Sequence, residues 1–168
     1  MSKVLVPVDS TLNSLQAVRH VVNEFVKNPA IEIHILNVQT PFSMHITQFS
    51  SKRDREALHR EQAETALRPT RQVLAFHSVP YVVHVEVGSK AQVIADTARR
   101  LQCDHILMGT ARKNAVTRVF DDSVTNKVLE LTTVPVQIIV GNAISRWKRF
   151  GIPAGLGTTV GLFLLAGD

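Results

Sequence analysis

The stretch from Gly109 to Ser123, GTARKNAVTRVFDDS, constrains the fold of this chain more than any other feature. It follows an apolar segment, DHILM at residues 104–108, and precedes a segment with helical spacing of apolar residues at Val124 and Val128. In parallel sheets, a loop from a strand to the next helix lies at the carboxyl edge, where free N–H groups of the helix N-terminus attract anions. The stretch therefore predicts an α/β fold with an anion site at this loop.

Strand and helix patterns alternate along residues 1–140. Runs rich in β-branched residues predict strands, and apolar residues at helical spacing predict the helices between them. This alternation predicts an α/β fold with one doubly wound, five-stranded, mostly parallel sheet, Rossmann-like, with helices on both faces. The predicted strands cover residues 4–8, 31–38, 81–87, 105–108 and 134–140, and the predicted helices cover 10–27, 52–77, 92–101 and 123–131.

Two prolines mark local departures from this alternation. Residues 41–51 begin with Pro41 and are polar and mixed, which predicts a loop. The helix over 52–77 contains Pro69, and because proline lacks the N–H that a helix interior needs, we expect a kink or a break there. The helix that begins near residue 10 has Asp9, Ser10 or Thr11 as its expected cap.

The stretch from Gly109 to Ser123 resembles the nucleotide loop of the universal stress protein family, whose pattern is G-x2-G-x9-G-[S/T]. Gly109 and Ser123 keep their places, but Arg112 and Asp122 stand where the second and third glycines would be. Residues 3–9, KVLVPVD, resemble the first strand of the family, and residues 123–140 resemble its last helix and strand. Residues 1–140 thus resemble one UspA-like domain, which implies an adenine-nucleotide alpha-hydrolase-like fold.

The resemblance implies a site for ATP or AMP at the carboxyl edge of the sheet, with Asp9 facing the adenine. Arg112 occupies space that a glycine would leave for a phosphate, although its guanidinium can donate to phosphate oxygens. Asp122 adds a negative charge, so we expect nucleotide binding to be weakened or lost. The residues that the resemblance places at the site are Pro7, Asp9, Val38, Met108, Gly109, Arg112, Ser123 and Val124.

Two functions remain open from the sequence. The first is a non-enzymatic, cytoplasmic universal stress protein that acts in stress adaptation as a homodimer, through protein partners that the sequence does not identify. The second is a member that binds ATP or AMP and hydrolyses it slowly or not at all. The family implies dimerisation through the last strand, since an apolar edge strand is a liability unless it is paired. The strand residues expected at that interface are Val134, Val136, Ile138 and Val140.

Charge and motif content argue against other functions. The net charge is +5, but no aromatic residues alternate with the basic ones, so we predict no nucleic-acid binding. No catalytic motif was found, which predicts no catalytic residues. His34, His84 and His105 fall in separate predicted strands, so we expect no metal site. Cys103, the one cysteine, is expected to be a structural thiol in a reducing compartment, and the N-terminus leaves no room for a signal peptide.

The segment after residue 140 has a composition different from that of the domain. Residues 141–149 form a linker that carries Arg146, Trp147, Lys148 and Arg149, and residues 150–168 form an apolar, glycine-rich tail. Basic residues and a tryptophan next to an uncharged run are typical of attachment to the cytoplasmic side of a membrane, so one of two open interpretations is contact of residues 147–166 with the inner membrane. The alternative is that the tail covers an apolar groove of the domain or of a partner.

Overall fold

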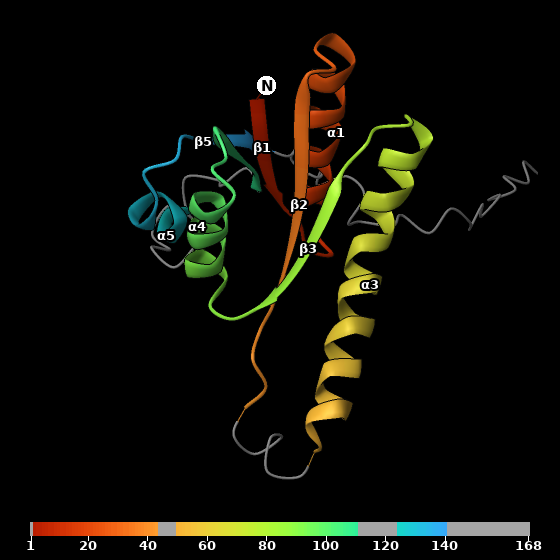
Figure 1. The fold of residues 1–168 in the computed structure, drawn as a ribbon, viewed down its shortest axis with the longest axis vertical. Helices are drawn as coiled ribbons and strands as arrows, with labels where there is room; N and C mark the ends of the chain where they lie inside the picture. The colour runs from red at the N-terminus through yellow and green to blue at the C-terminus, as the bar shows by residue number, and fades with distance from the viewer. Residues whose placement is uncertain (1, 44–49, 111–123, 141–168) are drawn as a thin grey trace, which may run out of the picture.

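The computed structural model describes residues 2–43, 50–110 and 124–140, in which strands and helices alternate (Figure 1). The helices begin at capping residues, with Thr11 and Ser51 accepting from the backbone N–H three positions on, at Ser14 and Asp54. The elements in chain order are β1 (Ser2–Pro7), α1 (Leu12–Lys27), β2 (Ile31–Gln39), α3 (Lys52–Phe76), β3 (Val82–Val87), α4 (Lys90–Arg100), β4 (His105–Thr110), α5 (Val124–Leu131) and β5 (Val136–Val140).

The five strands form one sheet in the order β3-β2-β1-β4-β5, and each neighbouring pair is parallel. Helices α1 and α3 cover one face, and α4 and α5 cover the other (Figure 1). The predicted doubly wound sheet is therefore confirmed. The chain adds β2 and β3 on one side of β1 and then returns to add β4 and β5 on its other side. The direction in which strands are added therefore reverses between β1 and β4, and β3 and β5 form the edges. Parallel sheets of this kind bind ligands at the reversal point, beyond the carboxyl ends of the strands.

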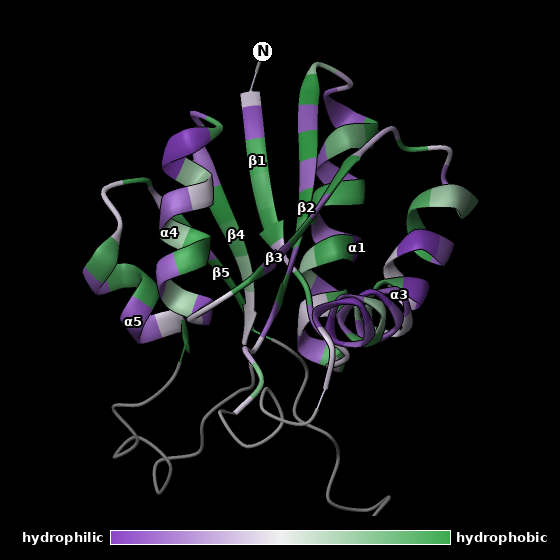
Figure 2. Ribbon diagram, turned by 60° about the horizontal axis from the view of Figure 1, so that its bottom comes forward, coloured by the Kyte–Doolittle hydropathy of each residue, from purple (hydrophilic) through white to green (hydrophobic). Residues whose placement is uncertain are grey.

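Two hydrophobic cores arise because successive side chains of a strand point to opposite faces. In β1, Val4 and Val6 pack under α1 and α3, whereas Leu5 packs under α4 and α5. The same division separates Leu107 from Ile106 and Met108 in β4. Strands β1 and β4 are correspondingly hydrophobic, while α3 is mostly hydrophilic (Figure 2). The central strands of the sheet are thus buried on both faces, and among the described residues its ends and its edge strands β3 and β5 are exposed to ligands and partners.

Helix α3 continues through Pro69, so a break at that residue is not observed. The missing N–H of Pro69 removes the helical hydrogen bond that the carbonyl group of Thr65 would otherwise accept. Buried residues nevertheless keep one helical face toward the sheet on both sides of the proline, namely Ala63, Leu67, Thr70 and Leu74. Their burial holds the helix in one piece across the lost hydrogen bond.

Several predicted boundaries shift by one or two residues. Helix α4 begins at Lys90 rather than at residue 92, and β5 begins at Val136, so Val134 precedes the last strand.

Within residues 2–43, 50–110 and 124–140, no helix is both long enough and apolar enough to cross a membrane. The predicted linker at 141–149 and the tail at 150–168 lie outside the described residues.

Candidate functional site

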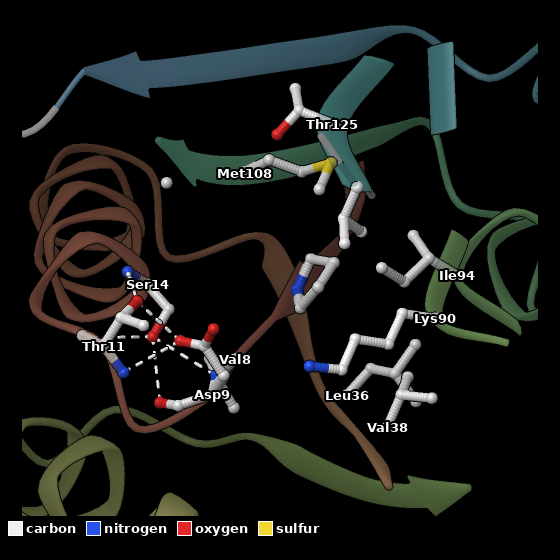
Figure 3. Close-up of a pocket in the computed structure, with 13 residues that line it drawn as sticks. Val8, Asp9, Thr11, Ser14, Leu36, Val38, Lys90, Ile94, Met108 and Thr125 are labelled. Atoms are coloured by element: carbon white, nitrogen blue, oxygen red, sulfur yellow. Dashed lines mark hydrogen bonds between the residues drawn. The ribbon is translucent and has the colours of Figure 1, made fainter. Parts of the chain in front are cut away.

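A cavity of about 120 Å³ lies at the carboxyl edge of the sheet, where the ends of β1, β2 and β4 meet the first turns of α1, α4 and α5 (Figure 3). Of the residues that the resemblance placed at the site, six line this cavity: Pro7, Asp9, Val38, Met108, Gly109 and Val124. The other two, Arg112 and Ser123, lie outside the described residues. The remaining lining residues are Val8, Thr11, Ser14, Leu36, Lys90, Ile94 and Thr125.

Asp9 is fixed by a hydrogen-bonded turn between β1 and α1. Its Oδ1 accepts from the backbone N–H of Thr11 at 2.9 Å and from the Thr11 hydroxyl at 2.6 Å. The buried Ser14 hydroxyl lies 3.0 Å from the Asp9 carbonyl oxygen and accepts from the Asp9 backbone N–H at 3.2 Å. This turn holds the carboxylate at the cavity before any ligand arrives (Figure 3).

The carboxyl group of Asp9 is ionised at neutral pH. Burial raises its pKa, but hydrogen bonds from Thr11 and Ser14 and the positive charge of Lys90 outweigh burial, so the net pKa is lowered from the model-peptide value of 3.8. A carboxylate accepts hydrogen bonds and cannot donate them. Because Thr11 already occupies Oδ1, the other oxygen is the one that a ligand N–H would reach.

Apolar side chains form the walls of the cavity. Leu36 is fully buried, Val8 is 4% exposed and Met108 is 6% exposed, and each forms part of the lining. Ile94 of α4 closes the side opposite Asp9 (Figure 3). An apolar slot with one carboxylate suits a flat heterocycle that carries an N–H group, since the walls bury its faces and the carboxylate accepts from its edge.

Gly109 brings the end of β4 into contact with the first turn of α1. A Cβ atom added at Gly109 would lie 1.8 Å from the carbonyl oxygen of Asn13 and 2.9 Å from the backbone nitrogen of Ser14. The sequence pattern suggested that this glycine lets a phosphate approach the backbone. The structure shows that it also lets α1 approach, which places the turn of Asp9 next to β4.

A second, polar cavity of about 420 Å³ adjoins the first and shares Asp9, Val38 and Lys90 with it. It lies between the end of β2 and α3 and is lined by Ser10, Asn37, Gln39, Thr40, Leu58, Glu61, Gln62, Thr65 and Ala66 as well. Asn37 is buried and donates from Nδ2 to the carbonyl oxygen of Val8 at 2.9 Å, which ties β2 to the end of β1. The two cavities together offer an apolar slot that opens into a polar chamber.

Sequence reasoning missed Lys90 and Ser14 as parts of the site. Lys90 was missed because α4 was expected to begin at residue 92, which placed the lysine in the preceding loop. Ser14 was missed because a serine in the first turn of a helix is usually a surface residue, and only the folded turn buries it against Asp9. The spacing from Asp9 through Thr11 to Ser14 was the available signal for this turn.

Two histidines that the sequence assigned to separate strands are brought together, away from the cavity. His34 Nδ1 lies 2.9 Å from His84 Nε2, across β2 and β3. His34 Nε2 lies 2.9 Å from Glu32 Oε1, and the His34 side chain is buried. Within the described ranges, no cluster of three or more histidine, cysteine, aspartate or glutamate side chains is arranged to hold a metal ion.

Comparison with solved structures finds the same fold in proteins of low sequence identity. The hypothetical protein MJ0577 superposes with a TM-score of 0.65 at 21% identity, over 84% of this chain and 96% of that protein. A universal stress protein family protein from Arabidopsis thaliana with AMP bound gives 0.59 at 18% identity, over 85% and 94%. A universal stress protein in complex with cAMP gives 0.61 at 16% identity, over 82% and 96%.

Sequence comparison gives the family. Universal stress protein MJ0531 of Methanocaldococcus jannaschii is 26% identical over 139 residues, which cover 82% of this chain and 81% of that protein. The model of the universal stress protein family matches residues 1–139, which include β1 to β4, β5 except its last residue, and the residues that line the cavity. The chain therefore belongs to the universal stress protein family.

Proposed function

We propose that this chain is a non-enzymatic universal stress protein that acts in the cytoplasm as a homodimer, through contacts with other proteins. Its cavity binds the nucleoside part of a purine nucleotide, and the protein binds the phosphates of that nucleotide only weakly. The observation that carries this proposal is the cavity at the carboxyl ends of β1, β2 and β4, with the preordered carboxylate of Asp9 in an apolar slot.

Weak binding of the phosphates follows from residues of the loop over 109–123. Arg112 and Asp122 replace two glycines of the family pattern, and each adds a side chain where the backbone would approach a phosphate. The negative charge of Asp122 opposes that of a phosphate, while Arg112 can offset only part of this repulsion. Residues 111–123 of this loop, which include Arg112 and Asp122, lie outside the described residues.

The absence of catalysis is proposed from the side chains at the cavity. Among the described lining residues, none is a histidine or a cysteine. Asp9 is the one carboxylate among the lining residues that the structure describes in the first cavity, and its hydrogen bonds with Thr11 hold it as an acceptor rather than as a base next to a nucleophile. A solvent-exposed phosphate chain would then have no group nearby to activate water.

The second candidate is a member that binds ATP or AMP and hydrolyses it slowly or not at all. This candidate is favoured by the two related folds of which one holds AMP and the other cAMP. The two candidates differ in the strength of the phosphate contacts, not in the location of the site. The affinity for ATP therefore separates them.

Calorimetric titration with ATP tests the proposal. We expect a Kd above about 100 µM, which corresponds to a binding free energy of about 5.5 kcal/mol. The double substitution Arg112→Gly and Asp122→Gly should tighten ATP binding at least tenfold, because it removes both obstacles in the loop. Asp9→Asn, which keeps the size of the side chain but removes its charge, should weaken binding in either background.

Micromolar ATP binding by the unaltered chain would contradict the proposal and would favour the second candidate. Release of phosphate from ATP, measured on the same samples, is expected to stay at the level of the buffer. Release that depends on the protein and is lost in Asp9→Asn would show that the chain is a slow ATPase.

A further inference from the structure

A groove of about 530 Å³ lies between the second half of α1 and the last turns of α3, two helices that cover the same face of the sheet (Figure 1). It is lined by Arg19, Val22 and Asn23 of α1, by Gln72, Val73 and Phe76 of α3, and by His77 directly after α3. None of these residues is among the described residues that line the two cavities of the candidate site. The groove is therefore a separate surface of the protein.

Two large apolar side chains are exposed at this groove. Phe76, the last residue of α3, lines the groove and is 85% exposed. Val26 is 66% exposed and lies one helical turn after Val22, on the same side of α1. Val22 and Val73 belong to the core under α1 and α3 and give the groove an apolar floor. Covering a phenylalanine removes about 150 Å² or more of apolar surface from water, so the groove favours an apolar occupant.

The exposed apolar residues of the edge strand β5 do not reach this groove. Ile138 and Val140 point to the side of α4 and α5, because Ile139 between them packs against the core under α1 and α3. A dimer that buries Ile138 and Val140 would leave the groove open. The groove therefore needs an occupant other than that dimer contact.

The segment that follows β5 has the composition of such an occupant. Residues 150–167, FGIPAGLGTTVGLFLLAG, contain no acidic or basic residue and no histidine. Burial of this segment would therefore remove no charged side chain from water, which is the costly part of covering a surface. Residues 141–168 lie outside the described residues, so the argument for this segment uses its composition and its point of attachment.

The segment is attached close enough to reach the groove. Ile139 of β5 is paired with Gly109 of β4, and Gly109 packs against Asn13 in the first turn of α1. From Asn13 to Val22, α1 rises about 14 Å, and a helix is about 10 Å across. The linker over 141–149 can span up to about 30 Å when extended. This length suffices to pass over α1 and to bring the apolar residues to the groove between α1 and α3.

We propose that residues 150–167 of this chain bind in the groove between α1 and α3 and cover Phe76 and Val26. The proposal assigns a place on the domain to the apolar tail, and it makes the tail an internal ligand of this surface. It does not depend on the proposed function, because the groove shares no described residue with the cavities of the candidate site.

Hydrogen–deuterium exchange followed by mass spectrometry tests the proposal in buffer without lipid. The full chain is compared with a chain that ends at Arg149. Backbone amides of residues 22–27 and 72–77 should exchange about tenfold more slowly in the full chain, because the bound tail opposes fraying of the two helix ends. Phe76→Glu in the full chain should abolish this difference, since it places a charge against an uncharged segment.

Leu131→Glu is the matched control. It places the same charge at a leucine that is 43% exposed on α5, which covers the opposite face of the sheet. The slow exchange at residues 22–27 and 72–77 should remain in this variant. Thermal melts of all the variants check that the fold is intact, so that faster exchange reports a lost contact and not a lost structure.

Four results would overturn the inference. Equal exchange in the full and the shortened chain would show that the tail does not cover the groove. Slow exchange that persists in Phe76→Glu would place the tail elsewhere on the domain. Slow exchange that is lost on dilution would show that the groove binds the tail of a second copy. Slow exchange of residues 150–167 only after addition of vesicles of phosphatidylglycerol would identify the membrane as the surface that the tail contacts.

Discussion

Gly109 both lines the candidate site and packs against the first turn of α1, so a substitution there affects the fold and the site together. Its Cα lies against the backbone of α1, and an added Cβ would meet the carbonyl oxygen of Asn13 at 1.8 Å. Backbone atoms cannot move aside as a side-chain end can, so either β4 or the first turn of α1 would have to shift. The turn that holds Asp9 begins at the same place, because Ser14 packs against it.

Gly109→Ala is therefore expected to lower the free energy of unfolding by about 2 to 4 kcal/mol and to weaken nucleotide binding as well. Gly88→Ala is the matched control, because its added Cβ would meet only the Cγ2 of Val93, at 2.8 Å, and a side-chain methyl can rotate away. Urea denaturation of both variants measures the difference. If Gly109→Ala lowered the free energy of unfolding by no more than Gly88→Ala does, α1 and β4 would be able to move apart at little cost in stability.

A histidine pair joins side chains of β2 and the edge strand β3, beside the backbone ladder of the two strands. His34 Nδ1 and His84 Nε2 face one another at 2.9 Å, so one nitrogen must donate and the other accept. Glu32 faces the other side of the His34 ring, and Lys3 on β1 lies 3.8 Å from Glu32. On the other side of the pair, Arg100 of α4 contacts Glu86 of β3 at 2.8 Å. Two fully protonated rings would place N–H against N–H, which the pair cannot accommodate.

Acid is therefore expected to destabilise this pairing. Burial lowers the pKa of His84, and the charges of His34 and Arg100 lower it further, while Glu86 opposes them. Below the unfolded pKa of about 6.5, the unfolded chain binds a proton that the folded chain does not, so stability falls as the pH drops from 6.5 toward the lower folded pKa. Above 6.5 both states carry neutral His84, and its contribution no longer changes with pH.

Urea denaturation at pH 7.5, 6.5 and 5.5 checks this expectation. Between pH 6.5 and 5.5, the free energy of unfolding should decrease by more in the unaltered chain than in His84→Gln, because glutamine at position 84 cannot take up the proton. His77→Gln, at the exposed end of α3, serves as the control and should keep the unaltered slope. If the free energy of unfolding depended on pH equally in all three proteins, protonation of the histidine pair would not be coupled to folding.

At the scale of the whole molecule, both edge strands expose apolar side chains, with Val82, Val85 and Val87 exposed on β3, and the family resemblance implies that β5 is the one that pairs with a second copy. Strand β5 carries Ile138 and Val140, which are 40% and 52% exposed, and the neighbouring helix α5 exposes Leu129 and Leu131. Val134 and Val136, also expected at a dimer interface, pack partly against the core under α4 and α5. Exposed apolar residues on an edge strand and its adjacent helix favour burial against a second copy.

We therefore expect Ile138→Lys to convert a dimer into a monomer, because it would place a charge in an apolar interface formed by two copies of β5. Val85→Lys introduces the same charge at a residue that is 44% exposed on the opposite edge strand, β3, and should leave the dimer intact. Light scattering of both variants measures the mass. If the dimer persisted in Ile138→Lys but was lost in Val85→Lys, the interface would lie at β3 instead of β5.

The sequence by itself determined the fold class and much of the lining of the site. Alternating strand and helix patterns sufficed for the order of the elements, because hydrophobic periodicity is a local property of the chain. The family resemblance placed a set of residues at one site from the spacing of short motifs. Six of them line one cavity, because the carboxyl ends of parallel strands meet at one edge of the sheet: Pro7, Asp9, Val38, Met108, Gly109 and Val124.

Only the tertiary structure decided features that depend on contacts distant in the sequence. Lys90 reaches the cavity because β3 and the start of α4 pack beside β2. His34 meets His84 diagonally across the two strands, because the register places His34 opposite Val82 and His84 opposite Leu36. The helix continues through Pro69 because burial on both sides outweighs one lost hydrogen bond. Each of these outcomes is set by long-range packing, which no local pattern of residues encodes.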